Sequence, residues 1–481
     1  MQRQLVWFRS DLRTLDNTAL ATAAKSGPVI AVFLRSVPQW QAQDHGINKI
    51  DFWHRGVRAL GDDLRGLNIP LLHRDIDTFD EAPKVLLKIA DEYGIEGGLH
   101  FNREYPLNEW RRDEAVIKAF KQDNHAVHPH TDAVAFAPGE LLTGQGDYYS
   151  VFTPFAKAWH REISAERLAL RDSPEAQQHL GIDNDRIPAL STLQAKQKNV
   201  LDGKPVDARH WPAGQEAAAD RLERFLHYRV RHYKDQRNFP AIQGTSELSA
   251  YLSLGMISHR QCLQAAMSAN GGSLAEGDAG LTSWVNELIW REFYQHIVLG
   301  YPDICRHEPF QRYTEKLAWR DDDEAFAAWC EGRTGYPLVD AAMRQLVQRG
   351  WMHNRLRMVT AMFLSKHLLI DWRRGEAFFM KHLIDGDFAS NNGGWQWAAS
   401  TGTDASPYFR IFNPTTQSRR FDPQGEFIAE FLSELAKLPD KARHAPPKDM
   451  LKEVDYPAPI VDHKAARARA LDAFKALKRD D

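Results

Sequence analysis

The chain has 481 residues, of which 43% are hydrophobic and 26% charged, and its formal net charge is −3. This length allows two or three domains with large cores, and the near-neutral charge excludes binding to nucleic acid through bulk basicity alone. The three cysteines form no CxxC pair, the N-terminus is charged too early for a signal peptide, and no apolar run approaches about 18 residues. These features predict a protein of the reducing cytosol with no disulfide framework, no zinc site and no membrane span.

The first third of the chain alternates short apolar runs with helical patterns. Such alternation predicts βαβ units and a doubly wound parallel sheet with helices on both faces. The expected strands are 4–8, 29–34, 69–76 and 97–101, and the expected helices are 49–67, 81–93 and 108–122. No GxGxxG or Walker A sequence follows these strands, so the α/β domain carries no standard nucleotide-binding motif.

Residues 131–205 are irregular, and they are predicted to form a connector with a helix or two near 151–170. From residue 206 to the end, nearly every segment has helical periodicity, which predicts an all-helical second domain. The expected helices there include 216–237, 283–299, 336–350, 354–370 and 425–438.

The expected helix at 283–299 has two distinct faces. Apolar residues recur every four positions and form a stripe for the core, namely Val285, Ile289, Phe293 and Ile297. A different face carries an acid, an indole, a guanidinium and a phenol, namely Glu287, Trp290, Arg291 and Tyr294. This second face suits a flat, polar ligand, and an Arg–Glu pair with two packed aromatic rings accounts for the same spacing.

The segment 344–358 contains four arginines and no acid. Asn354 and Arg355 lie within one helical turn of Met358, so a cation, an amide and a flexible apolar side chain are close together. This combination suits a phosphate backbone with an unstacked base beside it, and a solvated basic face is the alternative interpretation.

Two further segments contain polar groups near predicted helix starts. In residues 244–255, Thr245, Ser246 and Ser249 follow a glycine. This pattern predicts either a phosphate-binding site at a helix N-terminus or an ordinary helix N-cap. The Asp-Gly-Asp turn at 385–387 has two carboxylates that suit a metal, a ribose or a cation, although such turns commonly bind none of these. The histidines show no metal-ligand spacing, so no metal site is predicted. The stretch NNGGWQWAASTGTDASPYF at 391–409 contains no obvious nucleophile, base or metal ligand.

Taken together, these segments resemble the photolyase–cryptochrome family, and most closely the bacterial class I cyclobutane pyrimidine dimer photolyases. The resemblance spans nearly the whole chain, including LVWFRSDLRTLDN, YKDQRNFPAIQGTSELSAYLSLGMIS, VNELIWREFY, GWMHNRLRM and LIDGDFASNNGGWQWAASTGTDASPYFRIFNPTTQ. It implies an antenna-binding α/β domain at 1–130, an inter-domain connector at 131–205 and a helical FAD- and DNA-binding catalytic domain at 206–481.

The resemblance implies an enzyme that splits cyclobutane pyrimidine dimers in DNA under light. An excited, reduced FADH⁻ gives an electron to the dimer and later receives it back, so the cofactor carries the chemistry and no protein nucleophile is needed. The implied substrate is UV-damaged DNA, double- or single-stranded, in which the poorly paired dimer is easier to flip out than an intact base. The enzyme is expected to be a cytoplasmic monomer without metal.

The resemblance also assigns roles to individual residues. Glu287 is implied to hydrogen-bond the dimer, and Asn391 to face flavin N5. Three tryptophans, Trp319, Trp372 and Trp395, match an electron-transfer chain. The implied flavin contacts are Tyr233, Thr245, Ser246, Glu247, Leu248, Ser249, Arg357, Asp385, Gly386, Asp387 and Asn391, with Arg357 and Asp385 as a charge pair. The implied DNA or dimer contacts are Arg237, Glu287, Trp290, Arg291, Tyr294, Asn354, Arg355, Met358, Trp397 and Gln417.

A second, light-harvesting chromophore is also implied. His45, Asn108 and Glu109 match a pocket for 5,10-methenyltetrahydrofolate, and Arg306 stands where close relatives of the folate type have lysine. This replacement keeps the charge and changes the geometry. A deazaflavin is the alternative antenna.

The family contains two other functions that the sequence must be weighed against. A cryptochrome, a blue-light receptor without repair activity, often has Asp or Cys where this chain has Asn391, and this chain has no long tail after the helical domain. A 6–4 photoproduct photolyase tends to have a second histidine at the position of Asn354. A light-independent DNA-binding protein does not account for the flavin-pocket matches. Dimer repair is therefore the function that the sequence predicts.

Overall fold

The computed structural model describes residues 2–190, 192 and 203–477. It contains two compact units, one formed by Met1–Arg231 with Ser246–Pro302 and the other by His232–Thr245 with Asp303–Asp481. The predicted connector at 131–205 lies partly outside the described residues. The boundary between the two compact units differs from the predicted domain boundary at 206. The expectation that the antenna binds before this boundary, and that FAD and DNA bind after it, stays a prediction.

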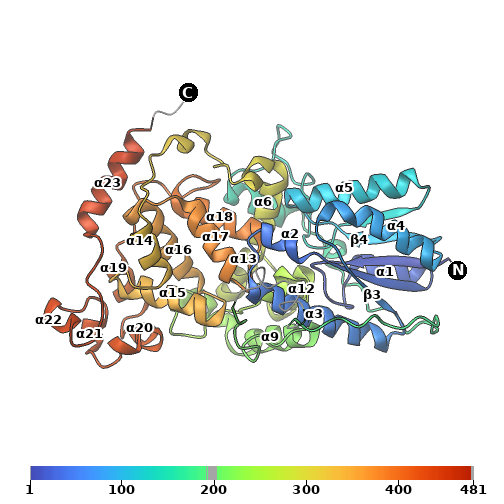
Figure 1. The fold of residues 1–481 in the computed structure, drawn as a ribbon, viewed down its shortest axis with the longest axis horizontal. Coiled ribbons are helices and arrows are strands. Elements are labelled where there is room, and N and C mark those ends of the chain that lie inside the picture. The colour runs from blue at the N-terminus through green and yellow to red at the C-terminus, as the bar shows by residue number, and fades with distance from the viewer. Residues whose placement is uncertain (1, 191, 193–202, 478–481) are drawn as a thin grey trace. The chain divides into compact units, whose positions relative to one another are not determined.

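The first unit contains a five-stranded parallel sheet in the order β3-β2-β1-β4-β5 (Figure 1). The strands are β1 (Gln4–Phe8), β2 (Val29–Arg35), β3 (Leu71–Asp75), β4 (Gly98–Asn102) and β5 (Val127–His130). The central strand pairs on both sides, with Leu5 opposite Ile30 of β2 and Leu99 of β4. Four of these strands are predicted from sequence. The strand β5 was missed because its sequence, VHPH, is polar and contains proline.

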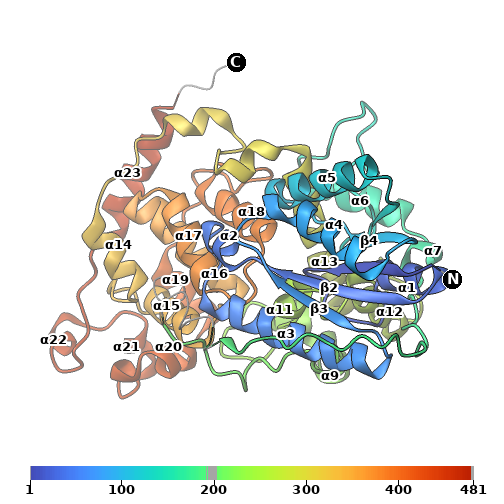
Figure 2. The ribbon, with the colours of Figure 1, turned by 45° about the vertical axis from the view of Figure 1, so that its right-hand side comes forward.

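Helices cover both faces of this sheet, which confirms the predicted doubly wound fold. Figure 2 shows α4 and α5 on one face and α3 on the other. On the first of these faces, Leu86 of α4 and Phe120 of α5 belong to one buried cluster with Leu5 and Trp7 of β1. The helices that follow or connect the first strands, counting both faces of the sheet, are α1 (Thr18–Ser26), α2 (Val37–Ala42), α3 (Ile47–Gly66), η1 (Phe79–Glu81), α4 (Ala82–Tyr93) and α5 (Leu107–Gln122).

Several later helices belong to the same unit as the sheet, and a buried ion network joins one of them, the helix that carries Arg260, to the segments that follow β1 and β5. Asp132 accepts from Arg13 at 2.6 Å and from Arg260 at 2.7 Å, and Arg260 also contacts Asp16 at 3.0 Å. Burial would raise the pKa of Asp132, but these two guanidiniums outweigh burial and hold it well below the usual range. The helices are α6 (Phe152–Glu162), α7 (Ala165–Leu168), α9 (Gln215–Tyr228), η2 (Val230–His232), α11 (Ser249–Ser253), α12 (His259–Ala269) and α13 (Ala279–Gly300).

In its described part, the second unit is helical, and its core contains the large side chains of Trp329, Trp372 and Trp395. The predicted helix at 354–370 is regular only through Met362. It continues as one π-helical turn that ends at Leu369, whose φ is +53°. The elements are α10 (Tyr233–Gln236), η3 (Pro302–Arg306), η4 (Arg312–Lys316), α14 (Asp323–Cys330), α15 (Pro337–Arg349), α16 (Asn354–Met362), η5 (Phe363–Leu368), α17 (Trp372–His382), α18 (Phe388–Ala399), α19 (Pro414–Phe421), α20 (Glu426–Phe431), η6 (Ser433–Leu435), α21 (Asp440–Arg443), α22 (Lys448–Leu451) and α23 (His463–Lys475).

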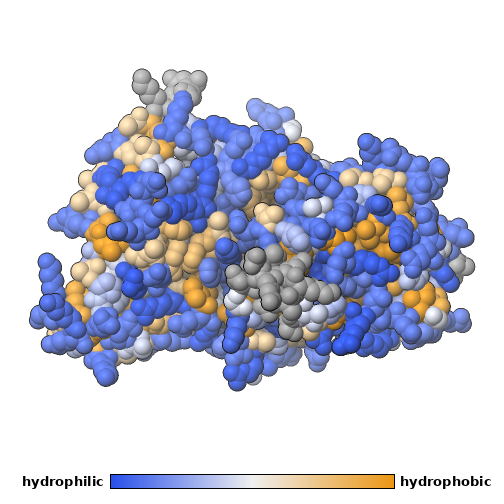
Figure 3. All heavy atoms as spheres, in the orientation of Figure 1, coloured by the Kyte–Doolittle hydropathy of each residue, from blue (hydrophilic) through white to orange (hydrophobic). Residues whose placement is uncertain are grey.

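The surface in Figure 3 is mostly hydrophilic, with apolar residues scattered between the polar ones. Among the described residues, no helix is both long and apolar enough to cross a lipid bilayer.

Candidate functional site

A buried ion pair lies at the turn between α17 and α18 in the second unit. Arg357 of α16 donates from Nη2 to Asp385 Oδ2 at 2.8 Å, and its Nε donates to the carbonyl of Met352 at 2.8 Å. Asp385 is 6% exposed, and its other oxygen, Oδ1, is buried without a hydrogen-bond partner among the described residues. A buried acceptor without a partner is costly, so this oxygen fits a ligand that brings an N–H or O–H group.

Asp387, two residues further on, has a structural function. Its Oδ2 accepts from the backbone N of Ser390 at 3.0 Å and from the Ser390 hydroxyl at 2.6 Å, so it caps the start of α18. In the described part of the chain, one group of three side chains is spaced closely enough to hold a metal ion, namely Asp91, Asp123 and His125. These side chains are exposed or half-buried, and none of them belongs to this turn.

A chain of amides fixes the orientation of α18 against α17. Asn391 donates to the carbonyl of Glu376 at 3.1 Å, and Asn392 donates to the carboxylate of Glu376 at 2.9 Å. Gln396 in turn donates to Asn392 Oδ1 at 2.9 Å. Asn391 is therefore a buried amide with a fixed side chain, as a residue that faces a rigid cofactor would be.

Trp395, on the same helix, is buried among other aromatic rings. Its ring lies at 4.9 Å from Phe379 and at 6.0 Å from Trp329, both edge to face, and its Nε1 has no hydrogen-bond partner among the described residues. Trp372 is buried in the same core, and the half-buried Trp319 packs against that core. The structure thus brings the three predicted tryptophans into one cluster. Trp329, which the sequence analysis did not single out, touches Trp395 directly.

A group of arginines surrounds the start of α16 and the end of α19. Arg355 donates to Asn238 Oδ1 at 2.6 Å and stacks over Phe421 at 4.6 Å, while Arg420 covers the same ring at 5.0 Å. Burial, together with the charges of Arg237 and Arg420, lowers the pKa of Arg355. In the described part of the chain, neither Arg355 nor Arg420 pairs with a carboxylate, so this cluster fits a phosphate group.

Other predicted DNA contacts lie beside this arginine cluster. Asn354 is exposed, and Met358 lies one turn further along α16 and is half-buried. Gln417 of α19 has a buried Oε1 without a partner in the described structure, and Trp397 of α18 is half-buried. The sequence analysis missed Arg420, although its position one turn after Gln417 on an amphipathic helix was a usable signal.

In the first unit, the two faces of α13 are as the periodicity predicted. The four residues of the apolar stripe are at most 2% exposed, whereas Glu287, Trp290, Arg291 and Tyr294 are all half-buried. Arg291 donates to the carbonyls of Ala133 at 2.8 Å and Leu252 at 3.3 Å. Its guanidinium is therefore partly engaged with backbone carbonyls.

The segment Ser246–Ser249 precedes a helix of five residues, α11. Leu248 occupies the N-cap position and no side chain caps the helix, so the ordinary N-cap that the sequence left open is not formed. Glu247 has a φ of +52° and pairs with Arg221 at 2.6 Å. Of the other predicted flavin contacts, Tyr233 is buried and Thr245 half-buried, and both belong to the second unit.

The predicted antenna residues of the first unit belong to two segments that one hydrogen bond joins. Gln43, two residues before His45, donates to Glu109 Oε1 at 2.8 Å, and Asn108 is exposed in the first turn of the same helix, α5. Burial raises the pKa of Glu109 to about 7, and burial with the charge of Lys49 lowers the pKa of His45. Arg306 belongs to the second unit, where it pairs with Asp303 at 3.0 Å.

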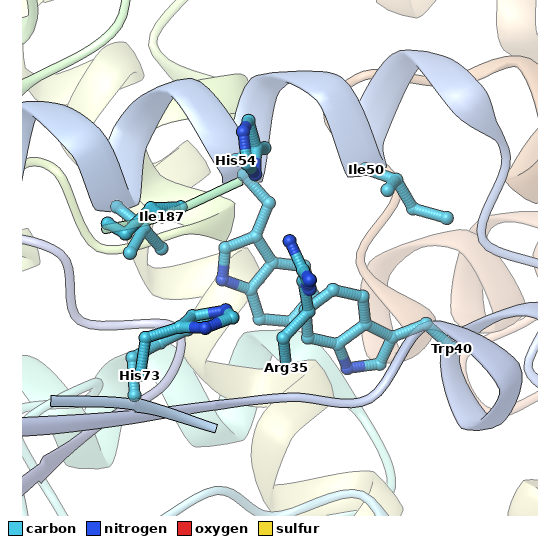
Figure 4. Close-up of a pocket in the computed structure, with 9 residues that line it drawn as sticks. Arg35, Trp40, Ile50, His54, His73 and Ile187 are labelled. Carbon is cyan, nitrogen blue, oxygen red and sulfur yellow. The ribbon is translucent and has the colours of Figure 1, made fainter. Parts of the chain in front are cut away.

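A pocket at the carboxyl end of β2 and β3 was not predicted from sequence (Figure 4). Its walls include the stacked rings of Trp40 and Trp53, whose centroids are 4.1 Å apart. Arg35, His54 and His73 supply the polar groups, and burial together with Arg35 lowers the pKa of both histidines to about 4. This edge of a parallel sheet is where α/β folds commonly bind ligands.

Comparison with known proteins gives two family matches. Residues 4–176 match the family described as DNA photolyase, and residues 284–476 match the FAD binding domain of DNA photolyase. A deoxyribodipyrimidine photo-lyase of Escherichia coli is 43% identical, with 100% of each chain covered. One of Salmonella typhimurium is also 43% identical, again over 100% of each chain.

Three solved structures with similar folds are two photolyases and a cryptochrome. A bacterial class III photolyase from Agrobacterium tumefaciens has a TM-score of 0.86 at 35% identity, covering 99% of this chain and 98% of that one. A Synechocystis cryptochrome has a TM-score of 0.84 at 26% identity, with 98% and 99% covered. An archaeal photolyase from Sulfolobus tokodaii with two FAD molecules has a TM-score of 0.79 at 27% identity, also with 98% and 99% covered.

Proposed function

The chain belongs to the DNA photolyase family, and we propose that it is a deoxyribodipyrimidine photo-lyase, which repairs cyclobutane pyrimidine dimers in DNA by a light-dependent reaction. The observation that carries this proposal is full-length identity of 43% to relatives of that name, combined with the Asp385–Arg357 pair and its unfilled acceptor. The 26% identity to a cryptochrome is much lower. The receptor and the 6–4 photolyase alternatives are therefore not favoured.

FAD is the cofactor of this family's helical domain, which residues 284–476 match. When bound, the reduced flavin supplies light-driven electron transfer. Two features of the second unit fit it: the buried acceptor Oδ1 of Asp385 and the fixed amide of Asn391. The proposed flavin contacts are these two residues with Tyr233, Thr245, Ser246, Glu247, Leu248, Ser249, Arg357, Gly386 and Asp387.

The protein's own contribution is to bind the damaged DNA and to hold the dimer in a dry, polar-edged site. Arg355, Arg237 and Gln417, with the newly identified Arg420, supply phosphate contacts, which set the register of the DNA. Trp290 and Trp397 offer aromatic surface to the dimer, while Asn354 and Met358 offer polar and apolar contacts. Glu287 presents a half-buried carboxyl that can hydrogen-bond the dimer and stabilise the charge that develops on it.

Trp395, Trp372 and Trp319 are proposed as the path by which electrons reach the buried site from the surface. Their support is position: two are fully buried, the third is half-buried, and all three contact one aromatic core.

The antenna is proposed to be 5,10-methenyltetrahydrofolate, held by His45, Asn108, Glu109 and Arg306. The hydrogen bond from Gln43, two residues before His45, to Glu109 supports this site. The pocket at β2 and β3 is the proposed place for the alternative, a deazaflavin. The archaeal photolyase, whose structure contains two FAD molecules, makes a second flavin another candidate.

The enzyme is further proposed to be a cytoplasmic monomer that acts on double- or single-stranded DNA without a metal ion. The test of the cofactor and substrate proposals is a pair of measurements on purified protein. Its absorption spectrum should show bound flavin, and in the dark it should bind an oligonucleotide with one thymine dimer more tightly than the undamaged oligonucleotide. A colourless protein, or equal affinity for both oligonucleotides, would contradict the proposal.

A further inference from the structure

The indole of Trp290 lies flat on the ring of Phe152. The two ring centroids are 3.7 Å apart and the planes differ by 8°, which is a close face-to-face contact. Phe152 is the first residue of α6, whereas Trp290 lies in the middle of α13, 138 positions later in the chain. A parallel stack at this distance fixes the plane of the indole as well as its position.

This pair lies at one end of a row of aromatic contacts between α6 and α13. Phe155, one turn further along α6, is fully buried and contacts Phe293 at 5.3 Å and His296 at 4.9 Å. Phe293, one turn after Trp290, also meets the edges of both Phe152 and Trp290. The half-buried rings of Phe152 and Trp290 thus contact fully buried rings, and this packing limits their freedom to rotate.

Tyr294 completes the support of the indole. Its ring lies 5.6 Å from that of Trp290 with an interplanar angle of 36°. One face of the indole is therefore covered by Phe152, and Phe293 and Tyr294 also contact the ring. Trp290 nevertheless keeps some exposed surface, and this remaining surface is what a flat ligand can stack on.

We propose that Phe152 is a positioning residue for damage recognition: it holds the Trp290 indole in the plane that a pyrimidine dimer stacks against. The inference rests on the proposed dimer-binding function of Trp290 and assigns the supporting role to a residue in another helix. A rigid wall loses little entropy when the ligand arrives, so removing the support lowers affinity for the dimer without touching the phosphate contacts.

The test measures dark affinity of the full-length, flavin-containing protein for two oligonucleotides, one with a single thymine dimer and one undamaged. Phe152→Ala should weaken binding of the dimer by about 3- to 10-fold and leave undamaged DNA unchanged. Phe152→Tyr should restore wild-type affinity because it keeps the ring. Phe152→Leu, which keeps the apolar volume and folds more easily, should behave like the alanine variant. Val151→Ala, an exposed neighbour, is the matched control.

A double-mutant cycle separates an effect through Trp290 from a general one. In a Trp290→Ala background, Phe152→Ala should change dimer affinity by less than about twofold. Additive losses, an equal loss for both oligonucleotides, or tighter dimer binding by Phe152→Ala would overturn the inference; the last result would mean that Phe152 occupies the ligand's place. Dimer preference retained in Trp290→Ala, or absent in the wild type, would instead contradict the proposed function itself.

Discussion

Gly375 of α17 lies directly against the indole of Trp395 of α18. A Cβ atom at position 375 would come within 2.1 Å of Trp395 Cη2 and within 2.6 Å of Leu364 Cδ2. The outer edge of an indole cannot bend away, so the glycine is required for the two helices to approach this closely. The position of Trp395, one of the three tryptophans of the proposed electron path, therefore depends on the absence of a side chain 20 residues earlier.

The variant Gly375→Ala should displace Trp395 or separate the two helices. We expect the free energy of unfolding to fall by about 1–3 kcal/mol, because overpacking outweighs the better helix propensity of alanine. Urea denaturation measures this change. Gly66→Ala is the matched control, since it is also a helical glycine and no atom lies within 4 Å of the added Cβ. Equal stability of the two variants would contradict the packing argument.

The variant Asp385→Asn should weaken flavin binding. It keeps the shape of the side chain, removes the charge that balances Arg357 and replaces one acceptor oxygen by a donor. We expect the Kd for FAD, measured by titration of the flavin-free protein, to rise by about 10- to 100-fold. Asp303→Asn, which breaks an exposed pair with Arg306, should leave the Kd unchanged. An unaltered Kd in Asp385→Asn would remove this carboxylate from the flavin site.

The variant Trp319→Phe should separate two activities. Light-driven reduction of the bound oxidised flavin should be blocked, because phenylalanine is far harder to oxidise than tryptophan. Repair by protein whose flavin was reduced chemically should be unaffected. Absorption spectroscopy follows the first activity and a dimer assay the second, with Trp211→Phe as the control. Loss of both activities would show that Trp319 has a structural role rather than a role in electron transfer.

The variant Glu287→Ala should lower the yield of dimer splitting more than it lowers DNA affinity. The carboxyl is proposed to stabilise charge that appears on the dimer only during the reaction, and an interaction of that kind changes rate more than binding. We expect the yield at saturating DNA to fall by roughly two- to tenfold, and dark affinity to change by less than about twofold. Glu287→Gln, which keeps a hydrogen bond, should lie between. An effect confined to affinity would refute the proposed role.

Lys366 should make stability rise with pH. This fully buried lysine of the π-helical turn donates to the carbonyl of Arg410 at 3.2 Å, and burial, with the charge of Arg410, lowers its pKa from 10.5 to about 7. Between these two values the unfolded chain binds a proton at this side chain and the folded chain does not. The free energy of unfolding should therefore increase by up to about 1.4 kcal/mol per pH unit above pH 7. Below pH 7 this side chain should add no pH dependence, because both states are protonated there.

Comparison of two lysine variants tests this expectation. Lys366→Met should lose this part of the pH dependence between pH 7 and 10, whereas the exposed Lys381→Met should keep it. Urea denaturation across that range gives the difference. Parallel pH profiles for the wild type and Lys366→Met would mean that Lys366 stays protonated in the folded protein.

The sequence predicted those features of the fold that local patterns determine. Buried strands such as β1 and β2 are continuous apolar runs, and the two faces of α13 follow from a period of 3.6 residues. The strand β5 could not be predicted, because its polar residues are held by pairing with β4 rather than by their own propensity. The break at Leu369 in the predicted helix 354–370 likewise depends on tertiary packing.

The site was predicted in part from residues and in larger part from family resemblance. The ion pair of Arg357 with Asp385 joins positions 28 residues apart, and no local pattern indicates it. Gly375 beside Trp395 and Phe152 beneath Trp290 are contacts between different helices, so they appear only in the structure. Arg420 was missed because no helix was expected at 414–421; once α19 is known, its spacing of three residues from Gln417 puts the two on one side of that helix.

The central claim is that this chain repairs pyrimidine dimers when it absorbs light. The most direct measurement is the amount of thymine dimer left in a defined oligonucleotide after incubation with the chemically reduced, flavin-containing protein, under blue or near-UV light and in darkness. The account predicts loss of the dimer with return of the two intact thymines in the light, and no change in the dark. Repair in darkness, or an unchanged dimer under light with reduced flavin present, would contradict it.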